Sequence, residues 1–185
     1  MTTVDAERFA PLTAFYDDAT MEMPRPWVID GAVMPEPYRS LLVNHGDMTP
    51  TLEKFHGHKL HLRVLGRSHV GNEYRRQVVL LDANDKPVEF GAIRIHLDVL
   101  LPEVQRQVLA GFRPLGGVLL EHNVPHTSQP SAYFAITGDD LINNALGVVE
   151  ACTLYGRCNT LIADTGKPIA EVVEVLPPVT LPPET

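Results

Sequence analysis

The clearest pattern in the chain is an alternation of apolar and polar positions between residues 73 and 97. A period of two over residues 74–81 predicts a strand. Turn-forming residues 82–86 follow it, and a second apolar segment at 87–95 predicts the return strand of a β-hairpin. One face of the first strand then carries Tyr74, Arg76, Val78 and Leu80.

This apolar face contains an arginine. Arg75, on the opposite face, has polar Gln77 beside it and can reach water, whereas Arg76 lies between aromatic and aliphatic neighbours. An unpaired charge buried there is costly, so Arg76 needs an anionic partner, either an internal carboxylate or a ligand. The strand taken alone favours an internal ion pair. An error of one residue in register would exchange Arg76 for Arg75.

The remaining periodicities predict short strands and short helices. Strands are expected at residues 58–65, 132–136, 148–163 and 168–176. Helices are expected at residues 37–45, 101–111 and 139–146, and a further helix is expected to begin after Thr49, which would be its N-cap. Loops are expected at 66–72 and 121–131, an apolar segment at 118–120, and a kink or bulge at Gly156.

Short turns between strands imply an antiparallel arrangement, because parallel strands need long crossovers. The fold class is therefore α+β: a single antiparallel β-sheet of about six strands with helices packed on it. We expect one domain over residues 1–185. Residues 1–36, which contain several prolines, are expected to form an irregular N-terminal arm, and residues 179–185 a frayed tail.

The last strand carries two carboxylates, one on each of its apolar faces. Glu174 shares a face with Val172 and Leu176, whereas Glu171 lies on the other face. A strand that is apolar on both faces is central or covered, so at least one glutamate is expected to be sequestered. Such a glutamate can serve as a general acid or base, or it can brace the sheet in a pair with an arginine.

Composition narrows the function classes. The 185 residues are 44% hydrophobic and 21% charged, as in an ordinary globular protein. The net charge of −8 opposes nonspecific nucleic-acid binding, which needs a basic surface. The chain has no apolar run of transmembrane length, and its first residues lack the pattern of a signal peptide. We therefore expect a cytoplasmic protein that contacts neither membrane nor nucleic acid.

Metal and redox chemistry have little support in the sequence. Cys152 and Cys158 fit no zinc or redox spacing. His56, His58 and His61 are close together, but no thiolate and no His-Glu-x-x-His helix accompanies them. We expect no metal site.

Four short stretches of sequence follow one another between about residue 40 and residue 177. They are Asp47-Met48-Thr49, the strand Tyr74–Leu81, Arg113-Pro114-Leu115-Gly116, and Leu154-Tyr155-Gly156-Arg157 with Gly166-Lys167-Pro168 and Glu174. Together they resemble the chorismate pyruvate-lyase family, which cuts chorismate into 4-hydroxybenzoate and pyruvate. The resemblance implies a chorismate lyase-like fold with an internal ligand site closed by flaps.

The resemblance also implies roles for individual residues. Arg76 would hold the ring carboxylate, and the backbone at Met48 and Leu115 would contact the same ligand. Glu174 would lie at the phenolic end, near the ether oxygen that leaves with the enolpyruvyl group. Catalysis would rest on Arg76 and Glu174 and would need no metal or organic cofactor. Register leaves Glu171 as the competitor of Glu174.

One departure from the family bears on the anion site. Asp47 stands where the family has serine, which adds negative charge near an anion site. Arg157 is expected to brace the sheet rather than contact the anion.

Two functions follow. The first is a lyase that converts chorismate, or a close relative, to 4-hydroxybenzoate and pyruvate. The alternative is a non-catalytic binding protein for a small aromatic carboxylate, because the effector-binding domains of one bacterial transcription-regulator family share the lyase-like fold. The short, proline-rich stretch before Asp47 does not predict a DNA-binding domain. In both cases the expected partner is a small anionic aromatic or cyclohexadienyl carboxylate.

Overall fold

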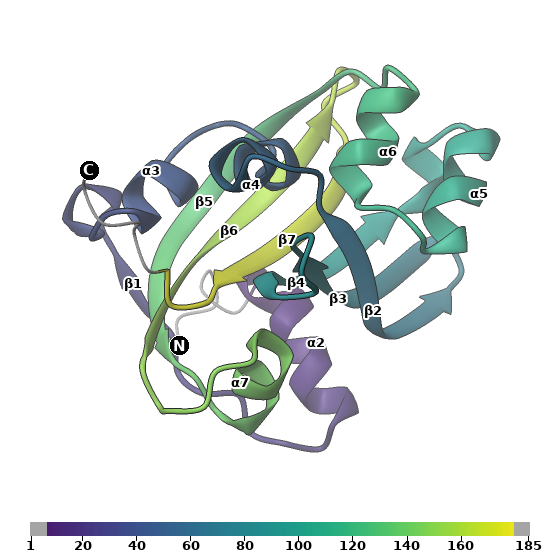
Figure 1. Ribbon diagram of the computed structural model, residues 1–185. Helices are drawn as coiled ribbons and strands as arrows, with labels where there is room; N and C mark the ends of the chain where they lie inside the picture. The colour runs from purple at the N-terminus through teal and green to yellow at the C-terminus, as the bar shows by residue number, and fades with distance from the viewer. Residues whose placement is uncertain (1–6, 180–185) are drawn as a thin grey trace.

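The computed structural model describes residues 7–179, which are organised around a seven-stranded antiparallel sheet (Figure 1). The order across the sheet is β1-β5-β6-β7-β4-β3-β2, so the last strand of the chain lies between β6 and β4 at its centre. The α+β class is confirmed, with seven strands rather than about six. The strands are β1 (Trp27–Ile29), β2 (His61–Val70), β3 (Glu73–Leu81), β4 (Pro87–His96), β5 (His126–Thr137), β6 (Thr153–Ala163) and β7 (Pro168–Leu176).

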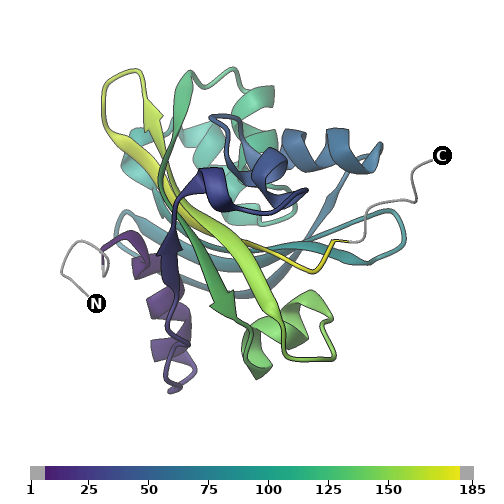
Figure 2. The same cartoon turned by 90° about the vertical axis from the view of Figure 1, so that its left-hand side faces the viewer.

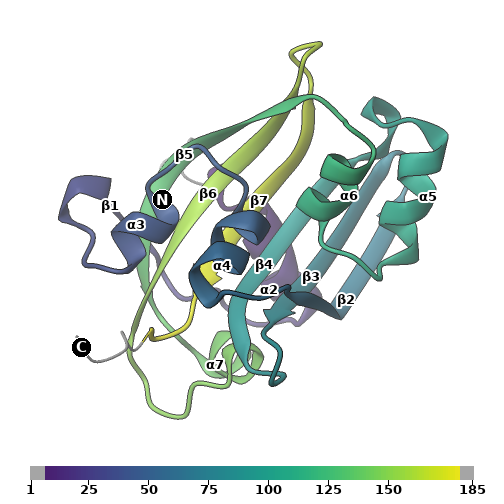
Figure 3. The same ribbon diagram turned by 45° about the horizontal axis from the view of Figure 1, so that its top comes forward.

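Helices cover both faces of the sheet. On one face lie α2 (Ala10–Asp18) and α7 (Asp140–Leu146) (Figure 2). On the other lie α3 (Tyr38–Leu42), α4 (Met48–His56), α5 (Pro102–Ala110) and α6 (Leu115–Glu121) (Figure 3). Two 3-10 turns, η1 (Gly31–Val33) and η2 (Leu97–Val99), complete the elements. None of the helices in residues 7–179 has the length and hydropathy needed to cross a bilayer.

The prediction of an irregular arm at residues 1–36 is wrong for most of residues 7–36, the part of it that the structure describes. Phe9, Leu12 and Tyr16 recur at helical spacing and are fully buried, so α2 packs its apolar side on the sheet. Pro11 is in the first turn of α2, where a missing N–H costs no helical hydrogen bond. Farther along, β1 pairs with β5 and supplies the seventh strand.

Three boundaries differ from the sequence prediction. The helix α4 begins at Met48 with Asp47 as its N-cap, so Thr49 lies inside the helix rather than capping it. The loop expected at 66–72 is largely strand, because β2 continues to Val70 beyond a register shift between Val64 and Gly66. Likewise, β5 begins at His126 inside the expected loop 121–131, and a register shift beside Pro130 accommodates that residue.

Two further predictions need correction in the second half of the chain. The apolar segment at residues 118–120 belongs to the helix α6. Gly156 is not at a bulge, because β6 keeps its register with β7 there. A glycine is needed for a different reason: a Cβ at this position would collide with the carbonyl oxygen of Glu174 and with the ring of Phe134. Of the tail expected to fray at 179–185, only Val179 is among the described residues, and its N–H donates to the Tyr38 hydroxyl at 2.9 Å.

Candidate functional site

A pocket lies between the sheet and the first turns of α4 and α6. The pocket and the space at its open side together contain about 510 Å³ that is not filled by atoms. The first residues of the two helices form one wall, and strands β2, β3, β4, β6 and β7 form the other. Its lining residues are Asp47, Met48, Thr49, Leu62, Arg76, Val78, Leu80, Glu89, Ile93, Pro114, Leu115, Gly116, Asn159, Leu161, Val172 and Glu174.

Strand register explains why these side chains meet. Residues that pair directly across antiparallel strands point to the same face of the sheet. One row on the pocket face therefore reads Arg76, Ile93, Val172 and Asn159, and the next reads Val78, Gly91, Glu174 and Arg157. Arg76 and Glu174 are two strands and one row apart, which places their Cα atoms at about 12 Å from each other.

The two residues that compete in register lie outside the pocket. Arg75 forms a 2.5 Å ion pair with Glu73 and is 39% exposed. Glu171 accepts a 3.0 Å hydrogen bond from Arg94 Nε and lies 2.9 Å from His96 Nε2. The pocket therefore contains Arg76, which the alternation of its strand indicated, and Glu174, which the resemblance favoured over Glu171.

Arg76 is fully buried, and most of its hydrogen-bonding capacity is unused. Nη2 donates a 3.3 Å hydrogen bond to the carbonyl oxygen of Arg113. Nε and Nη1 have no hydrogen-bond partner, and no ion pair to Arg76 is found among residues 7–179. Burial lowers the pKa of Arg76, but an arginine starts so far above neutrality that it stays charged. The internal carboxylate that the strand alone favoured as its partner is thus not present in the described chain.

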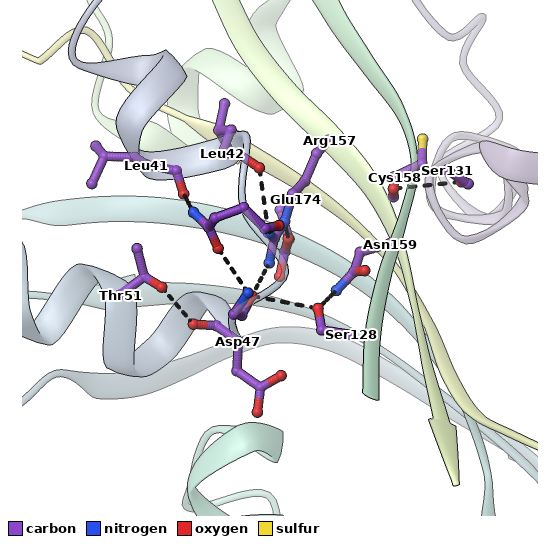
Figure 4. Close-up of polar contacts among 12 residues, drawn as sticks. Leu41, Leu42, Asp47, Thr51, Ser128, Ser131, Arg157, Cys158, Asn159 and Glu174 are labelled. Carbon is purple, nitrogen blue, oxygen red and sulfur yellow. Dashed lines mark hydrogen bonds and ion pairs between the residues drawn. The ribbon is translucent and has the colours of Figure 1, made fainter. Parts of the chain in front are cut away.

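Arg157 contrasts with Arg76 although both side chains are fully buried. Its Nε donates to Glu174 Oε2 at 2.5 Å (Figure 4). Nη1 and Nη2 donate to three backbone oxygens of the segment that leads into α4: Leu42, Asn44 and Gly46, at 3.4, 3.1 and 2.9 Å. Arg157 therefore ties β6 and β7 to the chain over the pocket and holds Glu174 in place. This agrees with the expected bracing role.

Sequence reasoning missed Glu89, a third carboxyl group in the pocket. Glu89 lies on β4 opposite Leu80 and is 5% exposed. Burial raises its pKa well above the ordinary value, the charge of Glu174 raises it further, and Arg157 partly offsets both. The parity of β4 could have identified it, since Glu89 shares a face with Ile93, the cross-strand partner of Arg76.

Asn159 and Asp47 are two further polar residues that line the pocket. Asn159 Nδ2 donates to Ser128 Oγ at 2.8 Å, whereas its Oδ1 is buried without a partner (Figure 4). Asp47 Oδ2 lies 2.9 Å from His126 Nε2. Burial lowers the pKa of His126, but hydrogen bonds to the Val124 carbonyl and to Asp47 outweigh it, so the net shift is upward. A protonated His126 neutralises the charge that Asp47 brings to the pocket.

Met48 and Leu115 occupy the first positions of α4 and α6. Their side chains are buried, and both residues line the pocket. The first N–H groups of a helix have no partner within the helix, so these positions can donate to an anion.

The histidines considered for a metal site do not gather around a common point. The rings of His56 and His58 are 5.9 Å apart, whereas His61 pairs with Asp85 at 2.8 Å. Within residues 7–179, no three histidine, cysteine or acidic side chains are arranged to hold a metal ion.

Comparison with known proteins identifies the fold. No family model and no curated protein matches the chain. The crystal structure of PhnF from Mycobacterium smegmatis is similar, with a TM-score of 0.57 and 12% identity over 90% of this chain and 92% of that chain. The effector domain of PhnF has the same TM-score and identity over 71% of this chain and 88% of that chain.

A GntR-family transcriptional regulator from Bacillus cereus is also similar, with a TM-score of 0.49 and 14% identity over 68% of this chain and 96% of that chain. The likeness to PhnF confirms the predicted chorismate lyase-like fold.

Proposed function

We propose that the pocket binds a small aromatic or cyclohexadienyl carboxylate and that Arg76 is its anchor. One observation carries this proposal: Arg76 is fully buried in a pocket wall with Nε and Nη1 unpartnered. A buried charged donor without a partner is strongly unfavourable, and a carboxylate satisfies a guanidinium through two parallel hydrogen bonds. An anionic ligand therefore completes the site.

The rest of the pocket supports a ligand with one ring. Leu62, Val78, Leu80, Ile93 and Val172 give apolar walls, and ligand pockets combine such walls with a few placed polar groups. Backbone N–H groups at Met48 and Leu115 would add donors to the same carboxylate. Glu174 would face the opposite end of the ring. The likeness to the effector domain of PhnF supports a binding role.

A binding experiment with a matched control tests this proposal. In isothermal titration calorimetry, 4-hydroxybenzoate should bind the wild type and Arg75→Ala alike, because Arg75 is outside the pocket. Arg76→Ala should lose at least about 30-fold in affinity, since truncating one partner of a buried charged pair costs roughly 2–5 kcal/mol. Circular dichroism would establish that the variant is folded. Undiminished binding by Arg76→Ala would reject the assignment.

The second candidate function is turnover of chorismate to 4-hydroxybenzoate and pyruvate. It is favoured by Glu174, a buried carboxylate that Arg157 holds in a fixed position in the pocket. In this reaction the bond between the ring and the ether oxygen breaks with its electron pair going to the oxygen, so that an enolate leaves. A ring proton is lost as the ring becomes aromatic, and the enolate gains one proton at carbon to give pyruvate. Glu174 would take the ring proton, and Arg76 would orient the ring.

Pyruvate release separates the two functions. A lyase releases pyruvate from chorismate in an assay coupled to lactate dehydrogenase, whereas a binding protein does not. For a lyase, Glu174→Gln should keep 4-hydroxybenzoate affinity within a few fold and slow pyruvate release by about 100-fold or more. Wild-type rates in Glu174→Gln would remove Glu174 from the reaction.

A further inference from the structure

The binding proposal leaves one buried group of the pocket unused. Glu89 lines the same pocket as Arg76 and Glu174, and it is 5% exposed. Its Oε2 atom is buried and has no hydrogen-bond partner among the described residues. A buried polar atom in this state calls for a partner from outside the chain, either a ligand or water.

The position of Glu89 suggests which part of a ligand it meets. A Cβ placed on Gly91 would lie 3.5 Å from Glu89 Oε1, so the carboxyl leans along β4 over the space that the glycine leaves. Gly91 pairs with Val78 on one side and with Glu174 on the other. This position is one strand and two residues from Arg76, or about 8 Å between Cα atoms. A single six-membered ring is a spacer of suitable size between the guanidinium and this carboxyl.

The protonation of Glu89 sets its chemistry. Burial and the charge of Glu174 raise its pKa well above the ordinary value, against a smaller opposite effect of Arg157. A protonated carboxyl group has one O–H donor as well as acceptor oxygens. Glu174, in contrast, is engaged as an acceptor by Arg157. When protonated, Glu89 thus presents the pocket with a donor for which no acceptor is found among residues 7–179.

We propose that Glu89 is a specificity-determining residue, which donates a hydrogen bond to an oxygen at the end of the ligand opposite its carboxylate. The inference rests on the proposed binding function and narrows its ligand class. The pocket selects ring carboxylates that carry a hydroxyl or ether oxygen at the far end over those that carry hydrogen there. An amide side chain at position 89 keeps a donor and should preserve the selection, whereas an aliphatic one should abolish it.

Benzoate and 4-hydroxybenzoate test this selection by calorimetry, because they differ only in the far oxygen. The wild type should prefer 4-hydroxybenzoate by about tenfold, the value of one well-placed hydrogen bond. Glu89→Gln should keep a preference of at least about threefold. In Glu89→Leu the ratio should fall to about one, while benzoate affinity changes less than threefold. Glu171→Gln, which removes a carboxylate on the opposite face of the sheet, is the matched control and should retain the wild-type ratio.

The outcomes separate this inference from the binding proposal. If both ligands bind the wild type equally and their binding depends on Arg76, the selection by Glu89 is wrong and the binding proposal stands. A full preference retained in Glu89→Leu also overturns the inference and assigns the far oxygen to Glu174. Binding of neither ligand would overturn both. Loss of the preference in Glu89→Leu with its recovery in Glu89→Gln supports the inference, since a purely structural role would not change the ratio.

Discussion

Replacing Arg76 by methionine should stabilise the ligand-free protein. Arg76 is fully buried with Nε and Nη1 unpartnered, whereas methionine is of similar length and has no donor. Each unsatisfied buried group costs roughly 1–3 kcal/mol, and exchanging buried charges for apolar side chains often gains 1–4 kcal/mol. Allowing for the lost hydrogen bond to Arg113, we expect Arg76→Met to gain about 1–3 kcal/mol in unfolding free energy.

The matched comparison is Arg157→Met, at an equally buried arginine. Here the guanidinium satisfies Glu174 and three backbone oxygens, so its removal leaves a buried carboxylate and carbonyls unpaired. The expected loss is about 3–5 kcal/mol. Replacing two equally buried arginines by methionine should therefore change the unfolding free energy in opposite directions.

Urea denaturation followed by circular dichroism measures both effects. The buffer must lack carboxylate, phosphate and sulfate, because an anion bound to Arg76 would stabilise the wild type by mass action. Added benzoate should then raise the midpoint of the wild type and leave Arg76→Met unchanged. A ligand-free Arg76→Met that is less stable than the wild type by more than 1 kcal/mol would refute the reasoning, because it would mean that Arg76 is already satisfied.

Three further predictions concern pH and packing. The unfolded chain loses the Glu89 proton above about pH 4.5, whereas the raised pKa lets the folded chain keep it to higher pH, so the unfolding free energy of the wild type falls as pH rises. In urea titrations, the stability of Glu89→Gln relative to wild type should therefore grow by up to about 1.4 kcal/mol per pH unit. A constant difference from pH 5 to 7 would contradict this. Gly156→Ala should lower the unfolding free energy by about 1–3 kcal/mol or more, because the added Cβ collides with β7. Gly117→Ala, in open space on α6, should raise the unfolding free energy by up to about 1 kcal/mol. Equal melting temperatures of the two variants would contradict both expectations. Because its pKa is raised in the folded state, His126 should stabilise the fold below about pH 6.5, and this contribution should be lost as pH rises through the folded pKa. His126→Gln should lack that pH dependence in melting curves. An unchanged profile would exclude the pair of His126 with Asp47 as the source of the pH dependence.

The sequence was most informative where one strand carries an unbroken alternation. Arg76 faces the pocket because β3 keeps its period of two from Tyr74 to Leu80, and that parity needs no knowledge of the rest of the chain. The two apolar faces of β7 likewise indicated a strand that is central or covered, and β7 is the central strand of the sheet. The same alternation placed Glu174 and Glu171 on opposite faces, although it could not show which face lies under α4 and α6.

What sequence reasoning missed depends on contacts between distant segments. Glu89 lies between Val88 and Phe90 and resembles a solvent-facing charge on a half-buried strand. The parity of β4 places it on the face of Ile93, but its burial depends on the segments that cover that face, which local periodicity does not record. The helix α2 differs from the irregular arm predicted from the prolines of residues 1–36, because Pro11 lies in the first turn of the helix, where a proline is compatible with helical structure.

The most direct test of the binding proposal is a crystal structure of the protein with 4-hydroxybenzoate. We predict that the ligand carboxylate lies within hydrogen-bonding distance of Arg76 Nε and Nη1, with the hydroxyl directed toward Glu89 and Glu174. A ligand carboxylate bound elsewhere, with Arg76 Nε and Nη1 still unpartnered or occupied only by water, would contradict it.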